Sequence, residues 1–433
     1  METLENQTNA RPFNNWQLSV KMLIIVALML LLLIPKVMIM SLIDERERTS
    51  RDVRNETMEK WSLDQTIRGP ILTLPYVEKT KDSEGKISQK ISYCHFLPKK
   101  LTADGDIVPQ KLNRNIYEAE GYTANLKING SFDIPDLKSL QIESENVLWD
   151  KAEISLSIND LRGINNEVNM KWNGAIYPFS PGLTFRNIGK DGLSLPLPEA
   201  VFPATFEIDL SLKGSDWLRF APLGETTNVK LRSSWSDPKF DGHYIPTNRD
   251  VSNGFTAEWN ITRYNRNYPQ QWTGSTFDVT ETDFGVNLLK MADHYQKSTR
   301  SAKYSFLIIL LIFLSFFLNE FITKQKIHTL QYILVGAAVL MFYVLLLSFS
   351  EHIGFNMAYL VATVLVTGMI LIYSHSFLRT WANSLLLTFI LILSLGFVFI
   401  LLQLETYSLL AGSIGLFVVL GLTMYFTNKI KLT

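Results

Sequence analysis

The amino-acid sequence predicts a membrane protein: a six-helix transmembrane bundle with a large β-rich, sandwich-like extracytoplasmic domain inserted between the first and second spans. Two observations predict this fold. Six apolar stretches approach or exceed the roughly 20 residues that a helix needs to cross the hydrocarbon core, and five of them fill the last third of the chain. The segment between the first and second stretches is polar instead, with strand-like alternation.

Each predicted span is an apolar run with few charges. The spans cover residues 18–43, 304–322, 329–349, 355–373, 384–402 and 408–426. Pro35-Lys36 interrupts the first span near one end, where we expect the Lys36 ammonium to reach the lipid headgroups. No small-x-small cleavage site follows this span, so we interpret it as an uncleaved anchor and not a signal peptide.

The short loops predict the orientation, because basic residues are enriched in cytoplasmic loops. Lys and Arg occur in residues 323–328, in residues 374–383 and in the C-terminal tail, but not in the turns at 350–354 and 403–406. The N-terminal tail (1–17) and the C-terminus are therefore expected in the cytoplasm. Basic residues that flank the large domain would favour the opposite orientation. We discount them because long segments translocate largely regardless of charge.

The inserted domain, residues 44–300, begins and ends with helical patterns. Residues 44–60 are rich in charge and free of Gly and Pro, which predicts a helix that continues the first span until Gly69-Pro70 ends it. A helical stripe returns at Phe284 and runs toward Tyr304. We expect these two helices to form a neck for the domain.

Between the two helical patterns, apolar residues alternate with a period of two, which is typical of half-buried strands. The predicted strands cover residues 71–77, 86–96, 117–132, 153–158, 206–212, 229–235 and 255–261. Turn signals separate them: Asp104-Gly105, Asn129-Gly130, Asn173-Gly174, Asp191-Gly192, Asp241-Gly242 and Asn253-Gly254. This spacing predicts antiparallel sheets packed as a sandwich. The tryptophans of the domain are expected in its core, although an aromatic binding groove is an alternative.

Composition and motifs argue against several functions. With 41 basic and 41 acidic side chains, the chain has no surplus of positive charge for a nucleic-acid partner. The lone Cys94 excludes an intrachain disulfide and a multi-cysteine metal site. No two histidines have helical ligand spacing, and no P-loop, GxSxG or HExxH motif occurs. We therefore expect no metal, no cofactor and no enzymatic activity.

The candidate functional residues are polar groups at span ends: Glu320, Glu351, His352 and Asn356. A carboxylate and a histidine in an apolar setting are typical of a proton relay or substrate site. Polar residues at span ends also simply mark the membrane interface. The second interpretation is favoured for Glu351 and His352, because sequence neighbours on a helix point about 100° apart.

The sequence also resembles a known family. Matching segments include Phe220-Ala-Pro-Leu-Gly224, Tyr268-Pro-Gln-Gln-Trp272, Arg300-Ser-Ala-Lys-Tyr304 and the run from Phe342 to Phe355 that contains Glu351-His352. Their order along the chain is similar to that in the CreD family of bacterial inner-membrane, cell-envelope-integrity proteins. The resemblance implies a cytoplasmic (inner) membrane location with a periplasmic domain and a role in envelope maintenance or stress response. It implies no catalytic residues.

Three functions remain open from the sequence. The favoured one is a non-enzymatic envelope protein whose periplasmic β-domain binds an envelope polymer, a lipid or a periplasmic protein, while the helices contact the bilayer. The alternative is a transporter or lipid-handling protein that uses Glu320, Glu351 and His352. A membrane hydrolase is the third. The sequence predicts no oligomeric state.

Overall fold

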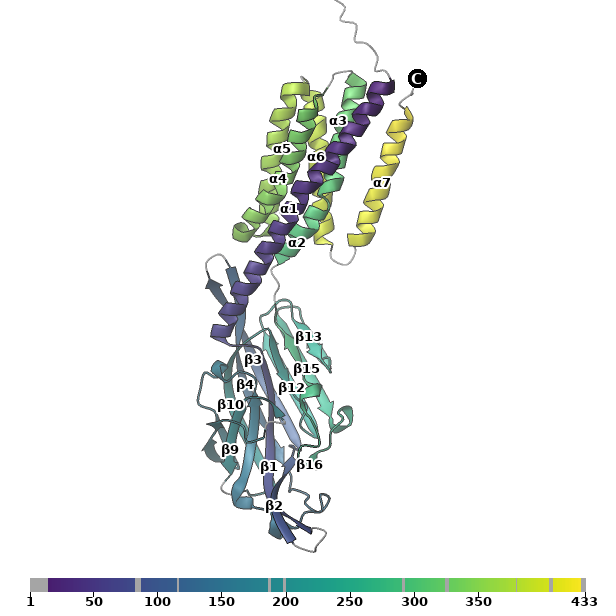
Figure 1. Ribbon diagram of the computed structural model, residues 1–433. Helices are drawn as coiled ribbons and strands as arrows, with labels where there is room; N and C mark the ends of the chain where they lie inside the picture. The colour runs from purple at the N-terminus through teal and green to yellow at the C-terminus, as the bar shows by residue number, and fades with distance from the viewer. Residues whose placement is uncertain are drawn as a thin grey trace, which may run out of the picture. The chain divides into compact units, whose positions relative to one another are not determined.

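The computed structural model describes residues 15–81, 87–114, 117–185, 188–197, 200–289, 293–323, 327–378, 380–404 and 408–429. The chain divides into two compact units (Figure 1). We call residues 1–51 and 292–433 the helical unit, and residues 52–291 the β unit. The β unit is thus an insertion between the first and second apolar helices, as predicted.

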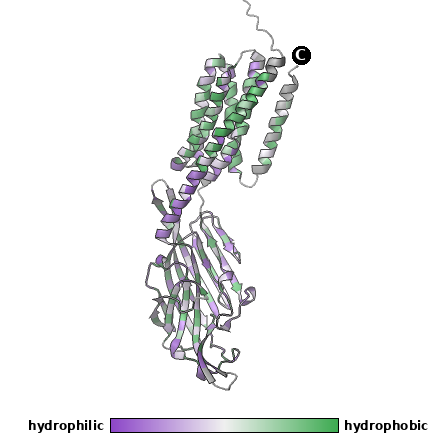
Figure 2. Cartoon of the chain, viewed as in Figure 1, coloured by the Kyte–Doolittle hydropathy of each residue, from purple (hydrophilic) through white to green (hydrophobic). Residues whose placement is uncertain are grey.

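Hydrophobic residues predominate on most helices of the helical unit, whereas the β unit mixes both kinds (Figure 2). The helices are α1 (Asn15–Trp61), α2 (Asp293–Lys303), α3 (Ser305–Thr323), α4 (Thr329–Ile353), α5 (Phe355–Leu378), α6 (Trp381–Gln403) and α7 (Ser408–Lys429). Among the described residues, five helical segments are long and apolar enough to cross a membrane: Val20–Trp61, His294–Glu320, Thr329–Ile353, Phe355–Leu378 and Trp381–Gln403. The predicted span 408–426 lies in α7, which is not among these five, so a sixth span stays a prediction.

Helix α1 continues past the first span, as predicted, and ends within one residue of the predicted segment 44–60. It runs through Pro35 and stops at Trp61. Gly69-Pro70 does not end it, because both residues lie inside strand β1. There the pairing with β5 shifts register between Arg68 and Ile71, and Gly69 has a φ of 143°. A glycine at an irregularity of a strand is a common arrangement, and it has the same sequence signature as a helix stop.

The second predicted helix begins later than expected. Residues Phe284–Asn287 form strand β17, all four of them buried, and α2 starts only at Asp293. A short run that is buried on both faces cannot be distinguished from a helix by periodicity alone. Tyr304 then separates α2 from α3, so the predicted continuous helix has a break.

The β unit contains two sheets (Figure 1). The larger has the order β13-β17-β11-β1-β5-β9-β8, with β2 on β1 and β16 on β2. Its strands are β1 (Gln65–Lys81), β2 (Ile87–Phe96), β5 (Ala152–Ile158), β8 (Ser180–Pro181), β9 (Gly192–Leu197), β11 (Trp217–Phe220), β13 (Lys239–Gly242), β16 (Gln271–Thr273) and β17 (Phe284–Asn287).

The second sheet has the order β14-β15-β12-β3-β4-β10-β6-β7. Its strands are β3 (Lys100–Arg114), β4 (Tyr117–Phe132), β6 (Asn169–Trp172), β7 (Ala175–Pro178), β10 (Ala204–Ser215), β12 (Thr226–Ser233), β14 (Asn248–Asp250) and β15 (Phe255–Thr262). Both sheets contribute to one contiguous hydrophobic core, which confirms the sandwich-like architecture. The expectation of purely antiparallel sheets is wrong, because β1 pairs with β11 and β3 pairs with β12 in parallel.

The tryptophans and glycines explain how this core is filled. Trp172, Trp235, Trp259 and Trp272 are buried, as expected for core residues. Two predicted turns are wrong: Asp104-Gly105 and Asn129-Gly130 lie inside β3 and β4. A Cβ atom at Gly130 would overlap the backbone carbonyl oxygen of Lys100 on β3 and would lie 2.7 Å from the ring of Phe206 on β10. The glycine is therefore explained by the close approach of both neighbouring strands and not by a turn.

Candidate functional site: buried polar groups of the helical unit

Glu320, the first predicted candidate, is buried near the end of α3 and is 3% exposed. Its carboxylate forms an ion pair with the ammonium of Lys21 on α1. Lys21 also donates a hydrogen bond of 2.9 Å to the backbone carbonyl of Ile327. Sequence reasoning missed Lys21, although a lysine near the start of the predicted span 18–43 was the available signal. The ammonium of Lys21 compensates the charge of the Glu320 carboxylate, and its contacts connect α1 to the loop before α4.

Glu351, near the end of α4, accepts a 3.0 Å hydrogen bond from the hydroxyl of Tyr295 on α2. His352 does not join them. Its Nδ1 lies 3.2 Å from the carbonyl oxygen of Ser348 on its own helix, and the contact is exposed. The structure therefore does not bring Glu351 and His352 together in a relay. Tyr295 is the partner that the sequence did not suggest.

Asn356, the last predicted candidate, accepts a 2.8 Å hydrogen bond from the side-chain amide of Gln403. This exposed contact joins the first turn of α5 to the last residue of α6. The four predicted residues thus take part in separate contacts. Glu320 lies next to the segment that leads into α4, whereas Glu351 lies at the other end of that helix.

A row of buried hydroxyls on α2 and the start of α3 was not predicted. Ser298, Ser301 and Ser305 are at most 1% exposed, and none has a hydrogen-bond partner. Their spacing of three and four residues places them on one face of the helix, together with Tyr295. The hydroxyl of Tyr343 on α4 is likewise buried without a partner. The signal in the sequence was the S-x-x-S-x-x-x-S spacing just before an apolar span.

Most other hydroxyls of the helical unit are satisfied within their own helices. Each donates to the carbonyl oxygen four residues earlier, a common arrangement for Ser and Thr inside helices. This group comprises Ser315, Thr363, Thr367, Ser384, Thr388 and Ser394. The three serines of the row do not make this bond, although all three occur in helical segments.

The row of hydroxyls surrounds the break between α2 and α3. At the break, the backbone N–H of Tyr304 donates to the carbonyl of Ser301 at 3.0 Å, in a tighter turn than an α-helix. The Lys36 ammonium, which was expected at the headgroups, lies 3.5 Å from the carbonyl oxygen of Lys303. These two contacts give partners to backbone carbonyls next to the break.

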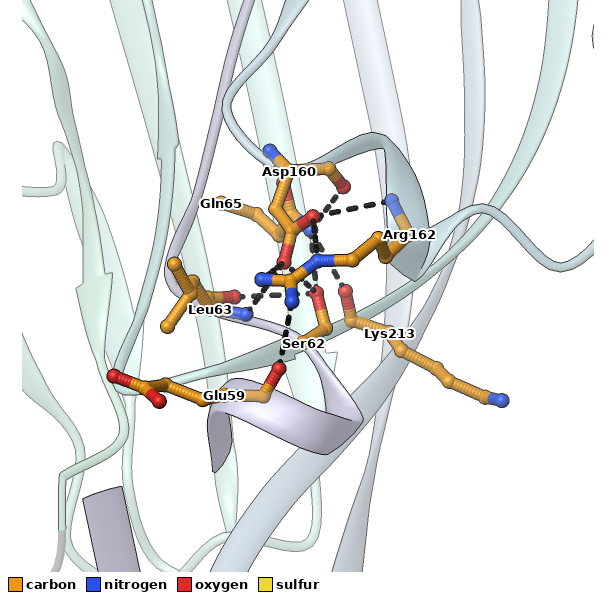
Figure 3. A network of polar contacts seen from close by, with 7 residues as sticks. All are labelled: Glu59, Ser62, Leu63, Gln65, Asp160, Arg162 and Lys213. Atoms are coloured by element: carbon orange, nitrogen blue, oxygen red, sulfur yellow. Dashed lines mark hydrogen bonds and ion pairs between the residues drawn. The ribbon is translucent and has the colours of Figure 1, made fainter. Parts of the chain in front are cut away.

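The β unit uses its buried polar groups differently. Asp160 is 7% exposed and accepts hydrogen bonds from the backbone N–H of Leu63 at 2.9 Å and from the Arg162 side chain (Figure 3). Gln65 donates to the carbonyls of Asp160 and Lys213, both at 3.0 Å. Burial alone would raise the pKa of Asp160, but hydrogen bonds from Arg162 and Leu63 bring it below its ordinary value. This network fixes the chain where α1 ends and β1 begins.

Two further reactive groups of the β unit are inert in this setting. Cys94 is buried, as expected, and burial raises the pKa of its thiol to about 12. The neighbouring His95 hydrogen-bonds the Thr73 hydroxyl through Nδ1 at 2.9 Å. Burial lowers the pKa of His95 to about 4, so its ring is neutral at physiological pH. Neither is placed as a nucleophile or a general base.

Arg266 also has its hydrogen-bond partners inside the β unit. Its guanidinium donates to the carbonyls of Tyr268 at 2.8 Å and Pro269 at 3.2 Å, and the side chain is buried. Among the described residues, no three His, Cys, Asp or Glu side chains gather in a way that could hold a metal ion. The buried polar groups thus offer structural contacts and hydroxyls, without a convergent set of charged groups.

Five apolar helices and a β-rich insertion between the first two define a membrane protein with one large polar domain. The sequence model of a family described as "Inner membrane protein CreD" matches residues 17–433. The chain is also 32% identical over 419 residues to the inner membrane protein CreD of Escherichia coli (strain K12), covering 95% of this chain and 92% of that protein. The chain belongs to the CreD family, which confirms the resemblance seen in the sequence.

Proposed function

We propose that this protein is a non-enzymatic component of the bacterial inner membrane that supports cell-envelope integrity or the response to envelope stress. Its β unit would lie in the periplasm and bind an envelope component or a protein partner. The observation that supports this most is the use of the buried polar groups of the β unit. Asp160, His95 and Arg266 are all engaged in contacts within the unit, which favours a binding role over a catalytic one.

A surface groove of the β unit is the best candidate for such binding. It has a volume of about 790 Å³ and lies on the segment between β4 and β5, within residues 134–145. Ile134 in its lining is 69% exposed, and the other lining residues combine apolar side chains with four charged ones, Asp136, Lys138, Glu143 and Glu145. An exposed apolar group with polar neighbours is typical of an interaction surface.

The role can be tested by complementation in cells that lack their own copy of the protein and are challenged with a wall-active antibiotic. We expect Ile134→Arg to lose protection, because a charge at the groove opposes an apolar contact. Ile245→Arg is the matched control, because Ile245 is 79% exposed and does not line the groove. Equal protection by both variants, at equal amounts in the membrane, would reject the groove.

The orientation has its own test, which uses the lone cysteine. In a Cys94→Ala background, Ile245→Cys reports on the β unit and His328→Cys reports on the loop before α4. We expect a membrane-impermeant maleimide to label the first but not the second in spheroplasts with an intact inner membrane. The reverse pattern would place the β unit in the cytoplasm.

A second candidate function, a transporter or lipid-handling protein, is favoured by one observation. The buried hydroxyls of Ser298, Ser301 and Ser305 flank a helix break, and broken helices form binding sites in many transporters. Complementation by Glu351→Gln, His352→Ala and Glu320→Gln separates the two functions. Full activity of all three variants would argue against a pathway that uses these groups.

A further inference from the structure

We infer that the break between α2 and α3 forms a binding site for internal water inside the helical unit. The site consists of the hydroxyls of Ser298, Ser301, Ser305, Tyr343 and Tyr359. This inference goes beyond the proposed envelope role and does not depend on it.

The first argument is the free-energy cost of burying hydroxyls without hydrogen bonds. Ser298, Ser305 and Tyr343 have buried hydroxyls without a partner, and the Ser301 hydroxyl has the Tyr359 hydroxyl as its neighbour. A hydroxyl buried without a hydrogen bond costs about 1–3 kcal/mol. Ser298, Ser301 and Ser305 also forgo the intrahelical bond that other serines of this unit make. Water that bridges them supplies the missing partners.

The second argument is that the hydroxyls converge from several helices. Ser301 on α2 lies beside the Tyr359 hydroxyl on α5, and the Tyr343 hydroxyl on α4 is an electrostatic neighbour of Tyr359. Tyr359 donates a 2.8 Å hydrogen bond to the carbonyl of Leu395 on α6, so its oxygen remains free to accept one. A buried water typically makes about three hydrogen bonds, and this arrangement provides them from three helices.

The chemistry of the lining selects the ligand. All five side chains are neutral hydroxyls, and the described residues contain no cluster that could hold a metal ion. Two charged groups that contact this segment are already engaged: Glu351 accepts from Tyr295, and Lys36 lies against the Lys303 carbonyl. Water both donates to and accepts from hydroxyls, so it fits a lining of neutral hydroxyls.

The water site also extends toward a titratable group. Tyr295 precedes Ser298 by three residues on the same helix face, and it carries the hydrogen bond to Glu351. The row therefore runs from the carboxylate at the end of α4 to the start of α3. Water along it would give Glu351 a polar connection into the helical unit.

Radiolytic hydroxyl-radical footprinting of the full-length protein in nanodiscs tests the inference, because radicals formed from bound water oxidise the side chains beside it. We expect Tyr343 and Tyr359 to be oxidised several-fold faster than Tyr122. Tyr122 is the matched control, because it is equally buried but its hydroxyl donates to the carbonyl of Trp217. Oxidation of Tyr343 and Tyr359 no faster than that of Tyr122 would overturn the inference.

Variants make the test specific to the site. Ser301→Ala should lower the oxidation of Tyr359, whereas Ser384→Ala should not, because Ser384 bonds to its own helix. Tyr343→Phe keeps the ring and removes one hydroxyl, so it replaces Ser301→Ala if that variant fails to fold. Equal oxidation in wild type and both site variants would overturn the inference. So would oxidation that falls when sodium replaces choline in the buffer, because the ligand would then be a monovalent cation.

Discussion

The β unit and the helical unit differ in their buried hydroxyls, because only the helical unit leaves some of those in the described residues without a partner. In the β unit, Tyr122, Ser62 and Thr73 have partners within the unit. In the part of the chain that the structure describes, every buried hydroxyl without a partner belongs to the helical unit: Ser298, Ser301, Ser305, Tyr332 and Tyr343. Water can reach the surface of a β-sandwich but not the lipid-facing part of a membrane helix. A buried hydroxyl without a hydrogen bond therefore costs more free energy in a membrane helix than in a sandwich.

The two units use their buried polar interactions for different purposes. The β unit uses them to fix chain ends and corners, as Asp160 does between α1 and β1. The helical unit uses the buried ion pair of Lys21 with Glu320 and a group of hydroxyls around a helix break. We therefore expect substitutions in the β unit to change mainly stability, and those around the break to change hydration.

The largest effect is expected at the ion pair of the helical unit. Lys21→Leu or Glu320→Leu leaves one buried charge without its partner, which typically costs about 3–5 kcal/mol. The double variant removes both charges and should recover most of the loss. The measurement is a double-mutant cycle on thermal unfolding in detergent, followed by helical circular dichroism. Strictly additive losses would show that the two side chains do not interact.

A comparable loss is expected in the β unit at Asp160. Asp160→Ala leaves the Leu63 N–H and the Arg162 guanidinium without their acceptor, at a cost of about 3 kcal/mol. Denaturant unfolding followed by tryptophan fluorescence measures it, because seven of the nine tryptophans lie between residues 61 and 272. Asp133→Ala is the control, because the Asp133 side chain is 61% exposed, and its change should stay within about 0.5 kcal/mol.

The pH dependence of the β unit gives a third test. Burial lowers the pKa of His95 to about 4, below the value of about 6.5 expected for the unfolded chain. The unfolded state therefore binds the proton first, and stability should fall by up to about 3 kcal/mol as the pH drops from about 6.5 to 4. His95→Phe should remove this component while leaving the acid loss from Asp160, which occurs at lower pH. If the free energy of unfolding depends on pH in the same way for wild type and His95→Phe, this prediction is wrong.

The sequence predicted the fold better than the site, for a physical reason. The alternation of apolar residues and the length of apolar stretches both reflect burial directly. The sequence therefore predicted strands β4 and β10 from residues such as Leu126 and Ile208. It also predicted the five apolar helices that are long enough to cross a membrane. The partners of Glu320 and Glu351 are Lys21 and Tyr295, which lie 299 and 56 residues away in the chain. Only tertiary packing pairs them. Gly69 and Gly130 misled the prediction, because a strand irregularity and a close approach of neighbouring strands require the same residue type as a turn.

The smallest effect is expected for Ser301→Ala, and it tests the difference between the two units most directly. In the absence of water, Ser301→Ala removes a hydroxyl that has no partner, which should leave stability unchanged or raise it. With bound water, the substitution removes a bridge and should cost about 1 kcal/mol. Ser384→Ala, also fully buried but bonded within its helix, gives the reference value for a satisfied serine. Thermal unfolding in nanodiscs should therefore rank Ser301→Ala at least as destabilising as Ser384→Ala, and a stabilised Ser301→Ala variant would mean that the helix break is dry.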